Sequence, residues 1–112
     1  MKYSIILSEE VRRFLKRLPV MAMKKILYNI DKVANGYGNN ELFKKLEHTQ
    51  LWEFRTLYEG VAYRLLAFWD TEKEALVIVT HGFIKKSQRT PTKEIAKAEE
   101  KRRAYFDLKK ER

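Results

Sequence analysis

Two arginines interrupt stretches of the sequence that are otherwise apolar. Arg55 lies within LWEFRTL and Arg64 within VAYRLLAFW, and Lys85, Lys86 and Arg89 follow the next apolar run within five residues. Strands normally alternate apolar and neutral polar side chains, so a guanidinium group in mid-strand needs solvent or a partner. A phosphate group suits it well, because phosphate oxygens match its planar fork of donors. These cations therefore indicate a binding site for a phosphate-bearing ligand.

His81 is a further candidate for proton transfer, because a free imidazole titrates near neutral pH. It alternates with Val77 and Val79 in a run that is nearly all apolar, so a hydrogen-bonded place in the core explains it equally well. His48 stands in a polar stretch and is the weaker candidate. With two histidines, no cysteine and no clustered carboxylates, the sequence predicts neither a metal site nor a cofactor.

The first part of the chain predicts a strand and two helices. Residues 3–7 form a short apolar run with two β-branched residues, and Ser8 has the character of a helix N-cap. Two apolar stripes at helical spacing follow, separated by Pro19, which cannot continue a helix. The first stripe is Val11, Phe14, Leu15 and Leu18, and the second is Met23, Ile26, Leu27, Ile30, Val33 and Ala34. Residues 42–46 fit either a helical turn or the start of a strand.

Three strands, at residues 51–57, 61–69 and 75–82, are expected to form an antiparallel meander. Alternation gives the first two strands one aromatic face, made of Trp52, Phe54, Tyr63 and Trp69. If this face packs on the two helices, Arg55 and Arg64 emerge side by side on the opposite face. A register shift of one residue would destroy this arrangement.

The last helix is expected to have Thr90 as its cap and Pro91 in its first turn. Its inner stripe comprises Ile95, Ala98, Arg102, Tyr105 and Phe106. The charged residues 107–112 are expected to fray. The element order β-α-α-β-β-β-α predicts a single α+β domain over residues 1–112, with helices against one face of a small antiparallel sheet.

The chain is strongly basic, with 24 Lys and Arg against 15 Asp and Glu and a formal net charge of +9. Such an excess favours a polyanionic partner such as nucleic acid or the ribosome, although an acidic protein would also fit. No apolar run is long enough to cross a membrane, and the N-terminus becomes charged too early for a signal peptide. Together with the absence of cysteine, this predicts a cytoplasmic protein without a membrane partner.

The segments that carry the cations resemble a known family. LWEFR at 51–55, Tyr63-Arg64 and HGFIKKSQRTP at 81–91, followed by Glu94, Ile95 and Ala98, are similar to the HigB-type, phage-derived toxins of the RelE/ParE superfamily. The resemblance spans residues 42–106, and its HGFxKKxQxTP segment is specific. The N-terminal helices fit the superfamily only as a pattern.

The resemblance implies a RelE-like fold and the toxin component of a type II toxin–antitoxin system. Such toxins are endoribonucleases that cut mRNA on the 70S ribosome, and a HigA-like helix-turn-helix antitoxin commonly holds them inactive. Carried over to this sequence, the active-site cations would be Arg55, Arg64, Lys85 and Lys86, with Arg89 in support. Ser87 and Arg89 stand where other members often have threonine and lysine, which keeps a hydroxyl and a charge.

RNA cleavage by attack of a 2′-hydroxyl needs a base, an acid for the leaving oxygen, and donors that stabilise the phosphorane; it needs no metal. We assign the phosphate to Arg55 and Arg64. Lysine can transfer the proton only if neighbouring cations lower its pKa. For this role we favour Lys86 over Lys85. Further candidates for RNA binding are Arg89, Tyr58, Lys44, Lys45 and Gln88, with Tyr58 as a stacking surface.

Other interpretations fit the same residues. Arg64 could form a surface ion pair with Glu53, and each lysine could be an ordinary solvated loop residue. The superfamily also contains inhibitors of DNA gyrase that cut nothing, and such an inhibitor is the alternative function. Phosphate donors clustered on a sheet face favour the nuclease. A simple nucleic-acid-binding module would show salt-dependent affinity for any RNA and no growth arrest.

Overall fold

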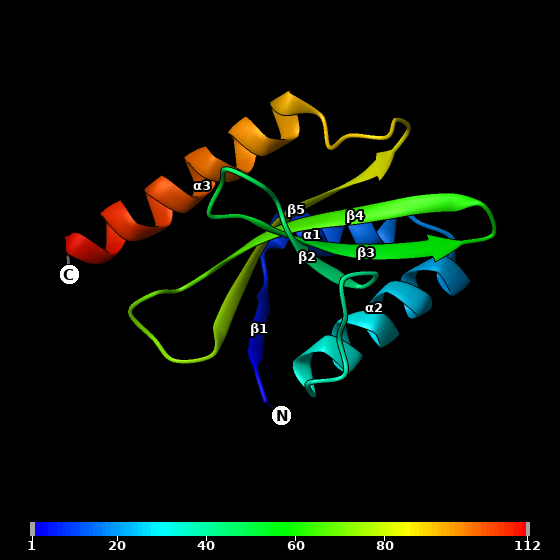
Figure 1. Cartoon of the computed structure of the whole chain (residues 1–112), viewed down its shortest axis with the longest axis horizontal. Coiled ribbons are helices and arrows are strands. Elements are labelled where there is room, and N and C mark those ends of the chain that lie inside the picture. Colours follow the sequence, from blue (N-terminus) through cyan, green and yellow to red (C-terminus); the bar gives the residue numbers. More distant parts are fainter. Residues whose placement is uncertain (1, 112) are drawn as a thin grey trace.

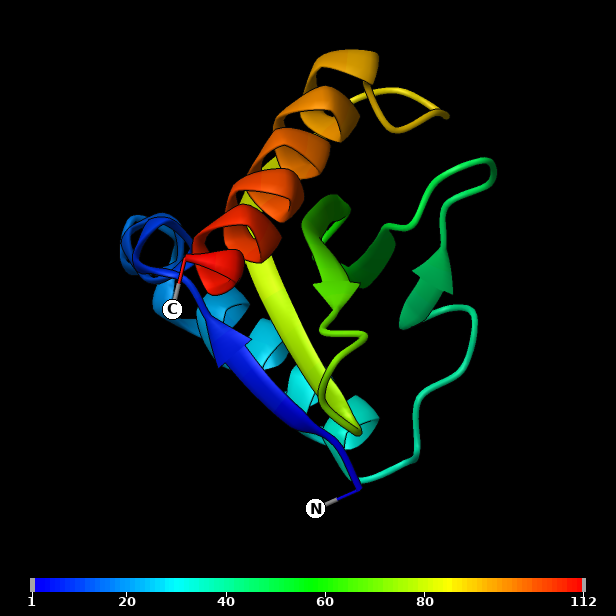
Figure 2. The same cartoon turned by 90° about the vertical axis from the view of Figure 1, so that its left-hand side faces the viewer.

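The computed structural model describes residues 2–111, in which a five-stranded sheet carries two helices on one face and a long helix on the other (Figure 1, Figure 2). The elements are β1 (Ser4–Leu7), α1 (Glu9–Lys16), α2 (Val20–Ala34), β2 (Phe43–Lys45), β3 (Trp52–Tyr58), β4 (Val61–Trp69), β5 (Leu76–Lys85) and α3 (Thr92–Lys110). The predicted α+β class is confirmed. The ambiguous stretch 42–46 contributes the short strand β2, which adds one strand to the expected order.

The strands lie in the order β1-β5-β4-β3-β2. Neighbours from β2 to β5 pair antiparallel, as the predicted meander requires. The sheet as a whole is mixed, because β1 joins β5 in parallel, with Ser4 opposite Leu76. Strand β1 thereby covers the edge of the long strand β5, which would otherwise expose unpaired backbone groups.

The α1–α2 pair packs on the aromatic face of β3 and β4, as predicted. Ser8 caps α1 by accepting a hydrogen bond at its Oγ from the amide of Val11 (3.1 Å), and Pro19 immediately precedes α2. The apolar stripe of α2 differs in one position, since Leu27 is exposed and Asn29 is buried instead. The Asn29 side chain donates a hydrogen bond to Thr56 Oγ1 of β3 (3.0 Å).

Helix α3 packs on the opposite face of the sheet, so the expectation that all helices cover one face is wrong. On that face β4 presents Leu66 and Phe68, which need an apolar cover, and α3 supplies Ala98 with Ile95, Tyr105 and Phe106 around it. The expected fraying from residue 107 is also not observed through Lys110, where the helix ends. Lys109 anchors this last turn by pairing with Asp70 (2.7 Å) and Glu72 (2.9 Å). Residue 112 lies outside the described residues.

Candidate functional site

Arg55 of β3 and Arg64 of β4 are direct cross-strand neighbours. Both side chains lie on the sheet face opposite the α1–α2 pair, because their strand neighbours Phe54 and Tyr63 point into the core beneath those helices. The predicted adjacency of the two arginines is therefore confirmed. It follows from side-chain alternation in two strands whose register is continuous from Trp52 to Tyr58.

Glu53 lies between the two arginines and is almost fully buried, with 2% of its surface exposed. Its Oε1 atom is 3.6 Å from Arg55 Nε and 3.3 Å from Arg64 Nε. Its Oε2 atom accepts a hydrogen bond from Thr90 Oγ1 (2.6 Å). The ion pair considered for Arg64 thus exists, but in a buried position and shared with Arg55. A buried carboxylate needs such partners, because an isolated charge in the interior is costly.

Sequence reasoning did not place Glu53 in the site, although a signal was present. Glu53 stands two residues before Arg55 and therefore shares its face of the strand. Thr90 was expected to cap the last helix, and this was wrong, since its hydroxyl is used by Glu53 and Pro91 occupies the cap position. The exit loop after β5 is tied to the arginine pair through this bond.

Each guanidinium group keeps donors for a ligand. Arg64 Nη1 donates to the carbonyl oxygen of Tyr63 (3.1 Å), and Arg55 Nη1 donates to that of Asn40 (3.2 Å). Within residues 2–111, neither Nη2 atom has a hydrogen-bond partner. Burial lowers the pKa of Arg64, and Glu53 acts in the opposite direction. An arginine stays charged under such shifts, so two oriented cations remain available to an anion.

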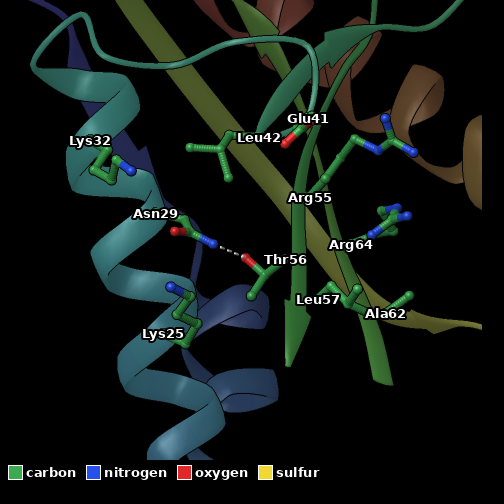
Figure 3. A pocket seen from close by; sticks show the side chains of 10 residues that line it. All are labelled: Lys25, Asn29, Lys32, Glu41, Leu42, Arg55, Thr56, Leu57, Ala62 and Arg64. Atoms are coloured by element: carbon green, nitrogen blue, oxygen red, sulfur yellow. Dashed lines mark hydrogen bonds between the residues drawn. The ribbon is translucent and has the colours of Figure 1, made fainter. Parts of the chain in front are cut away.

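Three open hollows converge on Arg55. The central hollow, of about 480 Å³, is lined by Arg55, Ala62, Arg64, Lys85, Lys86, Ser87 and Gln88. A second hollow includes Lys44, Lys45, Glu53, Arg89 and Thr90 and shares Arg55, Lys85 and Gln88 with the first. The third is the α2 groove, between α2 and β3 (Figure 3). The structure thus brings together the predicted residues Arg55, Arg64, Lys85, Lys86 and Gln88, and places Lys44, Lys45 and Arg89 beside them.

Lys85 lies deeper in the site than Lys86, which the sequence analysis favoured for proton transfer. Lys85 ends β5 opposite Ala62 of β4, on the same sheet face as Arg64, and is half-buried. Burial lowers its pKa, and so do the charges of Arg64, Arg55 and Lys44, while Glu53 raises it. Lys86 lies in the exposed loop that follows.

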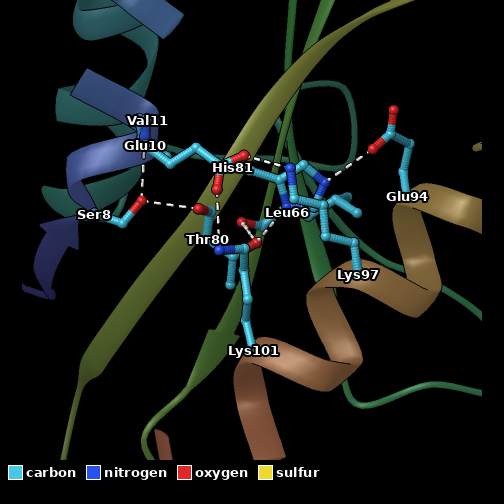
Figure 4. A network of polar contacts seen from close by, with 9 residues as sticks. All are labelled: Ser8, Glu10, Val11, Leu66, Thr80, His81, Glu94, Lys97 and Lys101. Carbon is cyan, nitrogen blue, oxygen red and sulfur yellow. Dashed lines mark hydrogen bonds and ion pairs between the residues drawn. The ribbon is translucent and has the colours of Figure 1, made fainter. Parts of the chain in front are cut away.

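His81 lies in the core and outside the three hollows. Only 1% of its surface is exposed, because α3 covers this part of β5. Its Nδ1 atom is 3.0 Å from Thr80 Oγ1 and its Nε2 atom 3.1 Å from Glu94 Oε1 of α3 (Figure 4). Burial lowers the pKa of His81 and so favours the neutral ring. This geometry gives no support to a catalytic His81. It agrees with the alternative interpretation, in which His81 is a hydrogen-bonded residue of the core.

Tyr58 also lies away from the arginine pair. It alternates with Thr56 along β3 and packs against the hydrophobic core on the α1–α2 side. The structure thus places Tyr58 outside the central hollow, beside which we expected it as a stacking surface.

No metal-binding cluster is found among residues 2–111, where no three His, Cys, Asp or Glu side chains could hold an ion together. In the same part of the chain no helix has the length and apolar character needed to span a membrane.

The fold is that of RelE toxins. A chain of the intact E. coli RelBE toxin–antitoxin complex superposes with a TM-score of 0.55 at 17% identity, covering 78% of this chain and 99% of that one. A mutant of E. coli toxin RelE in the free state gives a TM-score of 0.55 at 15% identity, covering 79% of this chain and 86% of the other. A search of curated proteins finds no match.

The family follows from sequence. Residues 13–103 match the family described as phage derived protein Gp49-like (DUF891), and the chain belongs to this family. The match includes both arginines, Glu53 and the exit loop after β5.

Proposed function

We propose that this chain is a HigB-type toxin of a type II toxin–antitoxin system and that it cuts mRNA on the ribosome. The observation that carries the proposal is the opposed pair Arg55–Arg64, held by a buried carboxylate and open to a hollow that also contains Lys85 and Lys86. The likeness of the fold to a chain of a toxin–antitoxin complex supports the toxin role.

Cleavage would proceed without a metal ion. The 2′-hydroxyl of a nucleotide attacks the adjacent phosphorus, the bond to the 5′-oxygen breaks, and the products carry a 2′,3′-cyclic phosphate and a 5′-hydroxyl. The free N–H groups of Arg55 and Arg64 donate to the non-bridging oxygens, where negative charge grows. The Lys85 ammonium group gives a proton to the leaving oxygen, and the proton of the 2′-hydroxyl leaves to water in the open hollow.

The partners follow from the same proposal. The substrate is mRNA in the 70S ribosome, to which a chain of net charge +9 is attracted. A HigA-like helix-turn-helix antitoxin holds the toxin inactive, and the setting is the cytoplasm.

Primer extension on cellular transcripts after brief expression tests the proposal. Wild type should introduce cuts within translated codons, and Arg64→Ala should abolish them. Arg103→Ala removes the same charge from an exposed position of α3 and should leave the cuts unchanged. Growth arrest with intact transcripts and DNA-damage signalling would overturn the proposal in favour of a gyrase inhibitor.

A further inference from the structure

The α2 groove is a second cationic surface, continuous with the central hollow. It encloses about 440 Å³ and shares Arg55, Ala62 and Arg64 with that hollow. Lys25 and Lys32 of α2 line its far wall (Figure 3). The two hollows therefore adjoin at the arginine pair.

An open sheet edge connects the two surfaces. Strand β2 pairs with β3 only from Trp52 to Phe54, so residues 56–58 have a strand neighbour on the β4 side alone. The lysines of α2 lie on one side of this edge and the two guanidinium groups on the other (Figure 3). Leu57 stands at the edge with 70% of its surface exposed.

Cationic and neutral polar side chains line most of the α2 groove. Its floor is the buried, mutually hydrogen-bonded pair Asn29 and Thr56 (3.0 Å). The ammonium groups of Lys25 and Lys32 lie 5.3 and 5.6 Å from the ring centroid of Tyr28, an exposed residue between them on the helix. Within residues 2–111 neither lysine has an ion-pair partner, although Glu41 also lines the groove.

We propose that the α2 groove binds the nucleotides of the mRNA that flank the cleaved bond. This inference rests on the function proposed above. A strand whose phosphate lies at the arginine pair can leave the central hollow through this adjoining groove, which supplies cations for its next phosphates. On the other side the strand leaves past Lys44, Lys45 and Arg89.

Site-specific crosslinking on ribosomes tests the proposal. The otherwise wild-type chain carries benzoylphenylalanine in place of Leu57 and is bound to ribosomes whose mRNA has 2′-deoxynucleotides in the decoding-site codon, which prevents cleavage. Irradiation should link position 57 to the mRNA. The same amino acid in place of Leu108, which is 58% exposed on α3, is the matched control and should not react with mRNA. Crosslinks from position 57 to rRNA or ribosomal protein alone would overturn the proposal.

Kinetics separate this subsite from the cleavage site. Lys25→Ala/Lys32→Ala should raise the ribosome concentration for half-maximal cleavage several-fold and leave the saturating rate nearly unchanged. Lys16→Ala/Lys24→Ala removes two exposed lysines of the same helical pair and should change neither. Equal behaviour of the two double variants would refute the subsite while cleavage itself persists. If unsubstituted protein cuts no ribosome-bound mRNA, the proposed function fails, and the subsite with it.

Discussion

Arg55 and Arg64 face each other across β3 and β4, and the Nε atoms of both approach a single carboxylate oxygen of Glu53. Like charges directly opposite each other in a sheet are normally destabilising. The buried carboxylate offsets this repulsion and fixes both guanidinium groups, while their outer N–H groups remain for a ligand. Both guanidinium groups are thus fixed in place without a ligand, as the proposed stabilisation of a phosphorane requires.

Replacing Glu53 by glutamine should expose this repulsion. We expect the free energy of unfolding of Glu53→Gln to fall by about 1–3 kcal/mol, because the buried Arg64 and the half-buried Arg55 lose their counter-charge. Urea titration measures it, with Glu100→Gln on the exposed side of α3 as control. Inorganic phosphate should raise the melting temperature of Glu53→Gln more than that of wild type. An unchanged urea midpoint would show that Glu53 does not hold the pair.

The pH dependence of cleavage should identify Lys85. As a general acid Lys85 must be protonated, so the rate should fall as pH rises through its pKa. Burial and the nearby cations lower that pKa, so the fall should occur at a lower pH than for an ordinary lysine. Lys85→Arg should lower the rate by about 100-fold or more and remove the fall, because arginine does not deprotonate. Lys86→Arg should retain the wild-type profile. A wild-type profile in Lys85→Arg would exclude this role.

His81 should matter for stability and not for chemistry. Glutamine at this position cannot contact Thr80 and Glu94 together as the imidazole does, so His81→Gln should lower the free energy of unfolding by about 1–3 kcal/mol. At a temperature where the variant is folded, its cleavage rate and pH profile should match those of wild type. If His81→Gln lost cleavage activity but kept the stability of wild type, His81 would be a catalytic residue after all.

The anchor of α3 should make stability depend on pH in acid. Burial alone would raise the pKa of Asp70. Hydrogen bonds from Lys109, Tyr105 and the amide of Glu72 outweigh this effect and lower the pKa to about 2. Because the pKa of Asp70 is lower in the folded chain than in the unfolded chain, where it is near 4, the ionised carboxylate stabilises the fold above about pH 4. This contribution is lost as the pH falls through the pKa of the folded state. Asp70→Asn should therefore lower the melting temperature at pH 7, and its difference from wild type should shrink between about pH 4 and pH 2. Asp107→Asn, on the exposed side of α3, is the control; a constant difference at all these pH values would contradict the assignment.

Local pattern was sufficient to predict the arrangement of the arginines. Two strands with aromatic residues on one face leave Arg55 and Arg64 on the other face, and antiparallel pairing places the two arginines opposite each other. The position of α3 was harder to predict, because its apolar stripe shows that it is covered and does not show by which face of the sheet. The alternation of His81 with valines likewise shows which residues share its face of the strand. It does not show whether that face is covered by a helix or open to a binding site.

Contacts between distant segments account for the remaining errors. Thr90 has the residue type of a helix cap, but a buried carboxylate 37 positions away takes its hydroxyl. Lys109 lies in a charged tail that local composition predicts to fray, and Asp70 anchors it from another element. The sequence also does not reveal which of the two adjacent lysines, Lys85 or Lys86, still belongs to the strand.

Single-turnover cleavage on purified, programmed ribosomes is the most direct test of the central proposal. Wild type should cut within the decoding-site codon and leave a 2′,3′-cyclic phosphate, and an mRNA with 2′-deoxynucleotides in that codon should stay intact. Arg64→Lys keeps the charge but loses the planar fork of donors, and it should slow the cut by about 100-fold. Cutting of the deoxy-substituted mRNA, or an Arg64→Lys variant as fast as wild type, would contradict a nuclease built on the arginine pair.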